Sequence, residues 1–271
     1  MFPSIAPREP HLRNWLYMKL ALLLLTAALV LSPQAVNLPG GSVSIGDLPG
    51  KETFYYDVEW RLITAGRAKV EYVRRPNADW QVNLRLESAG MVSTLYKVED
   101  DYFGYLSPSL CAESVQQNSH EGSRLRETRI AFDASARRAT YVERDRIKNA
   151  ILQQRAIEIP SCVHDVMGGI LLLRTLNLEP GRSTMVPMSD GKKSVMARVE
   201  AQAREDIKTP EGTFHTVRYE AYLFNDVLYR RSAHLNLWVT DDRRRLPVQI
   251  RVRMQFTIGT ITFQLRKHEG S

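Results

Sequence analysis

Few side chains in this sequence have the types and spacing that catalysis or metal binding requires. Glu99, Asp100 and Asp101 place three carboxylates in a row. In an extended strand Glu99 and Asp101 would point to the same face, about 7 Å apart, which would suit a calcium ion or a pair of catalytic acids. An exposed acidic turn is the simpler interpretation of the same run.

Histidines are the second group of candidates. His164 directly precedes Asp165, and His215 lies in a strand-like segment. Adjacent side chains of a helix do not face each other, so His164 and Asp165 would not form a pair there. A hydrolase site assembled from distant residues would draw on His164, His215, Glu99 and Asp101. The alternative for His164 is a structural residue that bonds locally at the start of a helix.

The recognised catalytic and cofactor motifs are absent. The sequence contains no G-x-S-x-G nucleophile turn, no H-E-x-x-H motif and no Cys/His cluster with zinc spacing. It also contains no P-loop, and no G-x-G-x-x-G motif follows a strand. We therefore expect no cofactor and no metal, and the sequence leaves open whether the protein is an enzyme.

An apolar run near the N-terminus is typical of a secretory signal. It extends from Leu20 to Leu31, twelve residues without a charge, and basic residues precede it. As a helix it would span about 18 Å, which is shorter than the hydrocarbon core of about 30 Å and favours a cleaved signal. We expect residues 1–35 to be a signal peptide, or an N-terminal anchor in which 15–31 hold the protein to the inner membrane. The predicted location is the periplasm or another part of the cell envelope.

Cys111 and Cys162 are the only cysteines, and each follows a proline in a turn-like context. An even number of cysteines in an exported chain suggests a disulfide. Bridging them would close a loop of about 52 residues, worth about 4 kcal/mol if the effect is loss of chain entropy. The alternative is a catalytic thiolate at Cys162 paired with His164, but nothing else is typical of a cysteine hydrolase.

Most of the sequence after a Gly/Pro-rich linker at 36–50 has the two-residue period of half-buried strands. Turn residues separate these segments, for example at 64–66, 133–135, 190–191 and 210–212. Residues 91–106 fit a short helical turn followed by a strand. The strand-like segments are 54–60, 68–73, 80–87, 125–132, 139–145, 151–159, 183–188, 194–203, 214–224, 227–231, 235–240, 248–257 and 261–265.

One segment, residues 163–178, has apolar side chains at helical spacing instead. We expect Ser161 to be its N-cap and Asp165 to lie in its first turn. Gly168 and Gly169 cost about 2 kcal/mol of helix propensity, which close packing of the helix on the sheet would offset. The predicted fold is mainly β: a curved antiparallel or half-barrel-like sheet packed on this one helix. Residues 51–267 would form a single domain.

The net charge and the apolar residues limit the classes of partner that we expect. Residues 1–35 carry Arg8, Arg13, Lys19 and Glu9, a net +2, so their removal lowers the formal charge from +7 to +5. The remaining basic residues are dispersed over strands, and we expect no nucleic acid partner. Aromatic residues and methionines on the strands suit an ordinary core. They would equally suit a concave face that is open to an acyl chain and closed by the helix.

The order of segments resembles an uncharacterised bacterial exported family, domain of unknown function 3108. The matching stretches are FYYDVEWRLITAGRA, HDVMGGILLLRTLNLEPG, the GKK turn, IKTPEGTFHTVRYE and LNLWVTDDRRRLPVQIRVRMQFTIGTITFQL. The last stretch is the most specific, and the resemblance spans about residues 50–266. It implies an envelope location and a β-rich fold, and it implies no activity or catalytic residue.

Three functions remain open on these grounds. The first is a non-enzymatic periplasmic binding or carrier module for a hydrophobic ligand or an envelope partner. The second is an envelope hydrolase with a scattered His/carboxylate site. The third is an assembly or scaffold protein that pairs through an exposed sheet edge. If the N-terminal segment is not cleaved, the membrane is a further partner.

Overall fold

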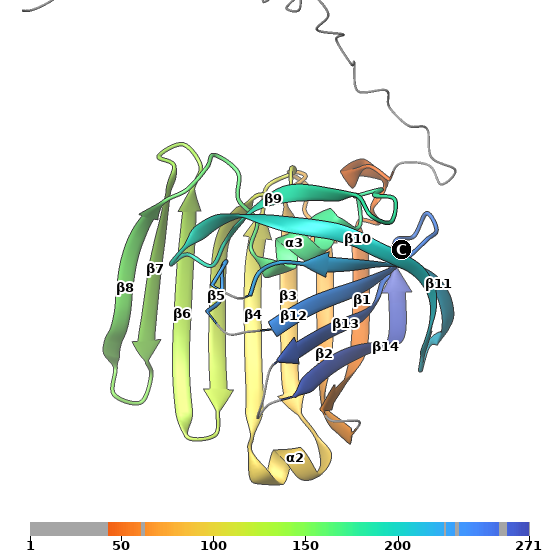
Figure 1. The fold of residues 1–271 in the computed structure, drawn as a ribbon. Helices are drawn as coiled ribbons and strands as arrows, with labels where there is room; N and C mark the ends of the chain where they lie inside the picture. The colour runs from red at the N-terminus through yellow and green to blue at the C-terminus, as the bar shows by residue number, and fades with distance from the viewer. Residues whose placement is uncertain (1–42, 61–62, 225, 231–232, 255–258, 271) are drawn as a thin grey trace, which may run out of the picture. The chain divides into compact units, whose positions relative to one another are not determined.

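The computed structural model describes residues 43–270, apart from 61–62, 225, 231–232 and 255–258 (Figure 1). The predicted signal or anchor, residues 1–35, and the first part of the predicted linker lie outside the described residues. Residues Gly40–Ser271 form one compact unit. Among the residues that the structure describes, no helix has the length and apolar character that crossing a bilayer demands.

The described strands form a single antiparallel sheet. Sequence neighbours pair throughout, except for β8 and β9, which are the two edges, and β1 pairs with β14. The order across the sheet is β8-β7-β6-β5-β4-β3-β2-β1-β14-β13-β12-β11-β10-β9. The strands are β1 (Lys51–Trp60), β2 (Ile63–Arg74), β3 (Trp80–Ser88), β4 (Val98–Leu106), β5 (Ala112–Glu121), β6 (Arg124–Asp133), β7 (Arg138–Asp145), β8 (Ala150–Glu158), β9 (Ser183–Ser189), β10 (Ser194–Thr209), β11 (Gly212–Ala221), β12 (Ala233–Thr240), β13 (Pro247–Met254) and β14 (Thr260–Gly270).

The sheet curls so that its two halves face each other (Figure 1). Strands β2–β7 form one layer, and β9, β10, β12 and β13 cross in front of it. Helix α3 (Val166–Leu173) lies between the two layers. Because the edge strands β8 and β9 do not pair, the sheet is half-barrel-like and not closed. This confirms the predicted fold class, a mainly β fold with a curved antiparallel sheet packed on one helix.

The two-residue period decides which side chains enter the space between the layers. In β1 the buried Phe54 and Tyr56 alternate with less buried residues, and in β2 Ala68 and Val70 do the same. The antiparallel register places Phe54 opposite Val70 and Tyr56 opposite Ala68. Full burial of a large apolar side chain stabilises a fold by about 1.5–3 kcal/mol relative to exposure, so the inner face holds the halves together.

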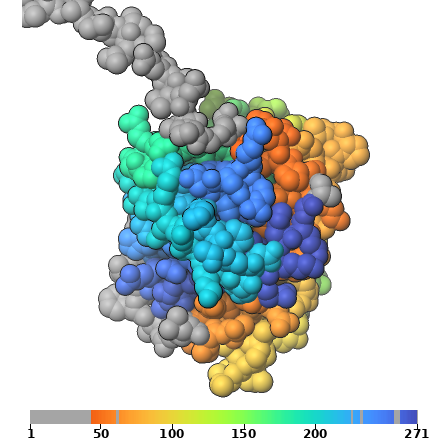
Figure 2. Space-filling view, turned by 90° about the vertical axis from the view of Figure 1, so that its right-hand side faces the viewer, coloured from red at the N-terminus to blue at the C-terminus, as the bar shows by residue number. Residues whose placement is uncertain are grey.

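The long β10–β11 hairpin covers the outer face of the C-terminal strands. The Trp238 Nε1–H donates to Glu205 Oε1 at 2.9 Å, and the backbone N–H of Glu211 donates to the Leu265 carbonyl at 3.2 Å. Figure 2 shows this hairpin in cyan at the surface, in front of the blue C-terminal strands. The sheet is therefore covered on both faces there, which explains why Trp238 is buried.

Helix α3 is shorter than the sequence predicted. It begins after Asp165, whose side chain accepts from the backbone N–H of Gly168 at 2.9 Å, and it ends at Leu173. The expectation that Ser161 caps a helix over 163–178 was wrong, because residues 163–164 bond to strands on either side. The expected close packing of the glycines is confirmed: a Cβ at Gly168 would lie 3.1 Å from Leu106 and 3.3 Å from the Leu110 carbonyl.

Two local predictions were wrong, and one strand was missed. Residues 64–66 do not form the predicted turn: they belong to β2, whose register with β1 extends to the pair Trp60–Ile63. Residues 227–230 form turns outside any strand, where a strand over 227–231 was expected. Strand β5 was not predicted, since its sequence AESVQQNSHE has no apolar alternation; cross-strand pairing on both sides builds it. The expected helical turn within 91–106 is confirmed as α2 (Gly90–Leu95), followed by β4.

The described end of the predicted linker packs on the domain. Val43 and Leu48 are buried in the same core as Phe54. Between them lies a short 3-10 helix, η1 (Ile45–Asp47), at whose start the backbone N–H and the hydroxyl of Ser44 both donate to the Asp47 carboxylate at 2.7 Å. The guanidinium of Arg74 donates to the Ile45 carbonyl at 2.6 Å and to the Leu48 carbonyl at 3.2 Å. These contacts tie the segment to the end of β2.

Candidate ligand-binding site

An apolar cavity of about 290 Å³ lies between the two halves of the sheet, beside α3. Its walls come from β1–β3, from α3, from the β11–β12 connection and from β12–β14. The lining residues are Tyr56, Ala68, Val70, Tyr72, Leu84, Val166, Met167, Ile170, Leu223, Phe224, Tyr229, Leu235, Leu237, Pro247, Ile250, Val252 and Phe263. The concave face of the sheet is therefore partly open. This agrees with the second of the two interpretations of its apolar residues, a face that leaves room for a ligand, and not with a completely filled core.

The hydroxyl groups of two tyrosines that line the cavity form hydrogen bonds with backbone carbonyls. The Tyr56 hydroxyl donates to the Pro247 carbonyl at 2.7 Å, and the Tyr72 hydroxyl donates to the Met167 carbonyl at 3.3 Å. Burial raises the pKa of both phenols, so they remain neutral. Because these hydroxyls already have partners, the rings present mainly apolar surface to the cavity.

A second cleft of about 350 Å³ adjoins this cavity; its walls are largely apolar but also carry several polar and charged groups, and we call it the polar cleft. The two spaces share four wall residues, Leu84, Val166, Met167 and Tyr229. The polar part of the cleft is lined by Asp100, Gln117, Thr128, Asp165, Ser189, Asp190 and Lys192. An apolar space and a polar space with common walls suit a molecule that has a hydrophobic part and a polar end.

Asp165 connects the polar cleft with the helix. Its carboxylate caps α3 and accepts a hydrogen bond from the hydroxyl of Tyr102 on β4. Burial raises the pKa of this carboxyl group, although the hydrogen bonds from Tyr102 and from backbone N–H groups oppose the shift. Sequence analysis placed Asp165 in the first turn of the helix, but it did not identify Tyr102 as the partner, because the two residues are 63 positions apart.

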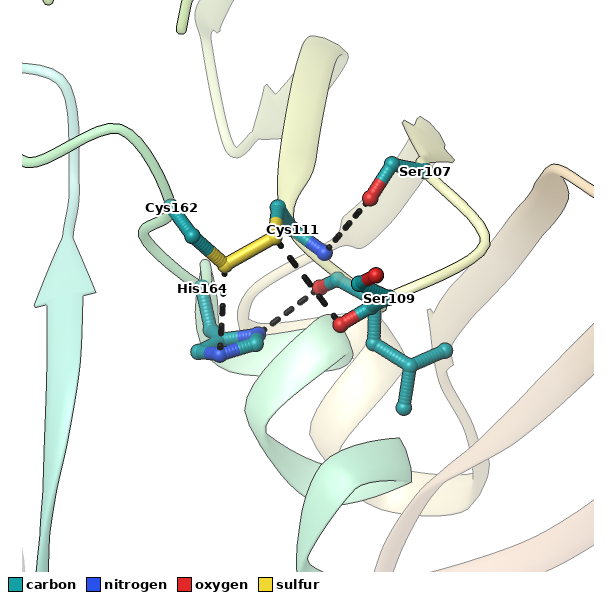
Figure 3. The surroundings of a disulfide bond; sticks show 6 residues. Ser107, Ser109, Cys111, Cys162 and His164 are labelled. Atoms are coloured by element: carbon teal, nitrogen blue, oxygen red, sulfur yellow. Dashed lines mark hydrogen bonds between the residues drawn. A yellow bond between two sulfur atoms is a disulfide. The ribbon is translucent and has the colours of Figure 1, made fainter. Parts of the chain in front are cut away.

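The predicted disulfide between Cys111 and Cys162 is confirmed (Figure 3). It links the β4–β5 connection to the segment that precedes α3, with a Cα–Cα distance of 5.1 Å. A disulfide-bonded sulfur is not a thiolate, so the alternative of a Cys162 nucleophile paired with His164 does not hold in this structure.

His164 lies beside the disulfide and is buried (Figure 3). Its Nδ1 lies 2.7 Å from the Leu110 carbonyl oxygen, and since a carbonyl only accepts, Nδ1 carries the proton. Burial lowers the pKa of the ring, although the hydrogen bond to Leu110 opposes this. These contacts are those of a structural residue that fastens a loop.

The backbone next to His164 joins the two halves of the sheet. The Val163 carbonyl accepts from Ala112 of β5 at 2.7 Å. The N–H of His164 donates to the Pro187 carbonyl at 2.8 Å, and its carbonyl accepts from Ser189 of β9 at 2.9 Å. The disulfide therefore locks the segment that connects one layer to the other and that sets the start of α3.

The two candidate carboxylates lie on β4 and have basic partners. Asp101 forms a bidentate ion pair with Arg85 at 3.0 Å for both oxygens. Glu99 lies 3.0 Å from Lys97 and 3.4 Å from His120. Among the described residues, no group of three His, Cys, Asp or Glu side chains is placed to hold a metal ion. Arg85–Asp101 and Glu99–His120 are cross-strand pairs between β4 and its two neighbours, and Lys97 directly precedes the same strand as Glu99.

His215 lies on β11 with 88% of its side chain exposed, and its partner is Asp206 of β10. The four residues considered for a hydrolase site, His164, His215, Glu99 and Asp101, thus bond to four different sets of neighbours. No hydrogen bond between described residues joins one of these candidates to another. The structure does not assemble the scattered site.

A buried ion network was missed by sequence reasoning. Arg174, fully buried just after α3, donates to Glu52 of β1 through both terminal nitrogens, at 2.5 and 3.0 Å. Its Nε donates to the Arg245 carbonyl at 2.9 Å. The Glu52 carboxylate also lies 3.0 Å from His268 Nε2.

This network keeps Glu52 ionised. Burial raises the pKa of Glu52, but the hydrogen bonds from His268 and Arg174 outweigh it and hold the pKa below its usual value. The available clue was a single arginine at an apolar position of the helical pattern.

Comparisons with known proteins bear on the fold and the family. The fold is similar to the crystal structure of a beta-barrel-like protein of the DUF1849 family from Brucella abortus, with a TM-score of 0.55 and 8% identity over 83% of this chain and 99% of that chain. A protein with a YmcC-like fold from Bacteroides fragilis matches with a TM-score of 0.35 and 8% identity, over 82% of this chain and 96% of that chain. A search of curated protein sequences finds no significant relative. The family model described as "Protein of unknown function (DUF3108)" matches residues 55–266, and the chain therefore belongs to this family.

Proposed function

We propose that this protein binds a hydrophobic ligand, such as a single acyl chain, in the apolar cavity beside α3, and that it acts in the cell envelope. The observation that carries the proposal is a cavity of about 290 Å³ with almost wholly apolar walls. Ligand pockets commonly measure about 300–1,000 Å³. The cavity lies at the lower end of that range, which favours a slender chain over a bulky ring system.

The energetics of such a site are favourable. Each methylene that leaves water contributes about 0.8 kcal/mol, so burial of ten methylenes would contribute about 8 kcal/mol before the cost of immobilising the ligand. The side chain of Met167 lines the cavity, and an unbranched thioether adapts easily to the shape of an occupant.

Two features support an envelope location. The apolar run from Leu20 to Leu31 with its basic flank is typical of an export signal. The Cys111–Cys162 disulfide persists in oxidising compartments such as the periplasm. If the signal is retained, residues 15–31 would hold the domain at the inner membrane, close to a source of acyl chains.

The cavity can be tested by filling it. Ala68 is 4% exposed on β2 and lines the cavity, so Ala68→Phe would place a ring where the ligand lies. We expect the variant to bind 1-decanol at least about tenfold more weakly in calorimetry, because several methylenes would lose their apolar surroundings. Native mass spectrometry and lipid extraction of the protein purified from its host should identify a co-purifying apolar molecule in the unmodified protein.

A matched variant controls for the substitution itself. Ala156 is exposed on β8 and lies outside the cavity, so Ala156→Phe should bind 1-decanol as the unmodified protein does. Circular dichroism would verify that both variants fold, since overpacking costs about 1–3 kcal/mol. The proposal is wrong if the unmodified protein neither carries an apolar molecule nor binds 1-decanol.

A further inference from the structure

The polar cleft beside the apolar cavity carries an excess of negative charge. The ionisable acids and bases that line it are Asp100, Asp165, Asp190 and Lys192. Three carboxylates and one ammonium group give a formal net charge of −2 (−3 + 1). Three different segments supply these four residues, since Asp100 lies on β4, Asp165 caps α3 and the other two lie in the β9–β10 turn.

These carboxylates are held in place but are not neutralised. Asp190 accepts from the backbone N–H groups of Lys192 and Lys193 at 2.9 Å each, and Asp100 accepts from the N–H of His120 at 3.1 Å. Asp165 has the contacts to Tyr102 and Gly168 described above. None of the three carboxylates takes part in an ion pair between described residues. A fixed carboxylate retains acceptor capacity beyond one or two neutral donors.

The single cation of the cleft lies over an aromatic ring of the same cleft. The ammonium group of Lys192 lies 4.8 Å from the centre of the Tyr141 ring, within the range of a cation–π contact. Tyr141 lines the cleft too, and no ion pair between described residues joins Lys192 to the three carboxylates. Burial also raises the pKa of Asp165 and Asp100, as expected for carboxyl groups that lack a cationic partner.

We infer that the ligand is an amphiphile with a cationic head, such as an alkylammonium group. The head would occupy the carboxylate-lined cleft while the chain fills the adjoining apolar cavity. The inference rests on the proposed function and names the chemical class of its ligand. A carboxylate or phosphate head would bring like charge close to three acids in a partly water-excluded space, which opposes binding. An ammonium head would supply the charge that the cleft lacks.

The test compares three probes of equal chain length: decylamine, 1-decanol and decanoate. Binding to the purified protein would be measured by calorimetry near neutral pH and below the concentrations at which the probes form micelles. We expect decylamine to bind at least about tenfold more tightly than decanoate, with 1-decanol between them. Binding of 1-decanol reports on the apolar cavity alone, so it tests the proposed function separately.

Conservative variants locate the effect. Asp165→Asn retains the ability to cap a helix, and Asp190→Asn and Asp100→Asn retain an acceptor oxygen for their backbone donors. Each variant, and the triple variant above all, should reduce decylamine binding and leave 1-decanol binding unchanged. The exposed Asp206→Asn on β10 is the matched control and should change neither.

The outcomes separate the two proposals. If 1-decanol binds but decanoate binds as tightly as decylamine, or the preference persists in the asparagine variants, the inference about the head is overturned and the apolar site stands. If none of the probes binds, both proposals fail. Should Asp165→Asn not fold, Asp100→Asn and Asp190→Asn still decide the result, because neither caps a helix.

Discussion

Arg174 has the most constrained environment of any charged residue described above. Its side chain is 0% exposed, and its carboxylate partner Glu52 is 1% exposed. Two charges removed from water are tolerated only when each finds its partner and its remaining donors bond to other groups. Here the remaining guanidinium donors reach the carbonyls of Arg244 and Arg245. This side chain therefore fastens the end of α3 to β1 and to the β12–β13 turn.

Replacing Arg174 by methionine should be severely destabilising. Arg174→Met would leave Glu52 charged and buried beside His268 alone, and loss of one partner of a buried ion pair costs about 3–5 kcal/mol. Urea unfolding would measure the difference. The control is Arg126→Met, which breaks one ion pair with Glu143 at 2.8 Å at a side chain that is 44% exposed. That change should cost about 1 kcal/mol or less. Equal losses in the two variants would contradict the assignment.

His164 should make stability depend on pH. Burial holds the pKa of the folded ring below its ordinary value of 6.5, so the unfolded chain binds the proton first as the pH falls. The contribution of the neutral ring is therefore present above about pH 6.5 and is lost as the pH falls through the lowered folded pKa. In His164→Gln the free energy of unfolding should decline less between about pH 7.5 and pH 5 than in the unmodified protein. Parallel pH profiles of the two proteins would disprove the role.

At the scale of elements, α3 is short and apolar, and it contains two adjacent glycines that have different neighbours. A Cβ at Gly168 would meet the Leu110 carbonyl at 3.3 Å and the capping oxygen of Asp165 at 2.9 Å. A Cβ at Gly169 would meet only the terminal atoms of Met188, at 3.0 and 3.3 Å. The neighbours of Gly168 are fixed in place by the disulfide loop and by the helix cap. The neighbour of Gly169 is the free end of a flexible methionine side chain.

The two glycines should therefore respond differently to the same substitution. Gly168→Ala should lower the free energy of unfolding by about 1–3 kcal/mol, because the loop of Leu110 and the cap cannot both move aside. Gly169→Ala should be neutral or stabilising by up to about 1 kcal/mol, since the gain in helix propensity exceeds the cost of moving a methionine. Thermal or urea unfolding of both variants provides the measurement. A reversed order would show that the packing of α3 differs from the described one.

At the scale of the whole molecule, the position of α3 depends on contacts with both halves of the sheet. The segment at Val163 and His164 bonds to β5 on one side and to β9 on the other, and the disulfide fixes it. The cavity lies where this arrangement keeps the layers apart beside the helix. Curvature of the sheet and placement of the helix thus produce the space together.

Export is the whole-molecule prediction. When the full chain is expressed in a bacterial host, we expect the folded protein in the periplasmic fraction, because the apolar run is too short for a stable span and favours cleavage. N-terminal sequencing of that fraction should find a start near residue 36. Recovery of the uncleaved chain in the membrane fraction would instead support the anchor formed by residues 15–31. Recovery of the intact chain in the cytosol would contradict both.

Much of the fold could be predicted because it depends on local periodicity. The alternation in residues 54–60 and 80–87 predicts strands, and the turn at Asp190-Gly191 is where β9 meets β10. Strand β5 escaped prediction because polar residues fill most of its sequence and only its neighbours hold it extended. The disulfide was predictable from the only two cysteines of a chain with a predicted export signal, since no other pairing existed.

The candidate site could not be predicted in the same way. Alternation tells which residues share a face, but it does not tell how far a sheet bends or which distant residues then meet. The pairs Tyr102–Asp165 and Glu52–Arg174 are 63 and 122 residues apart in sequence, and no local pattern connects them. The sequence by itself determined most of the strands, the presence of the apolar helix and the cysteine pair, and it predicts the export segment. Only the tertiary structure decided that His164 fastens a loop and that carboxylates gather beside an apolar cavity, because curvature brings those residues together.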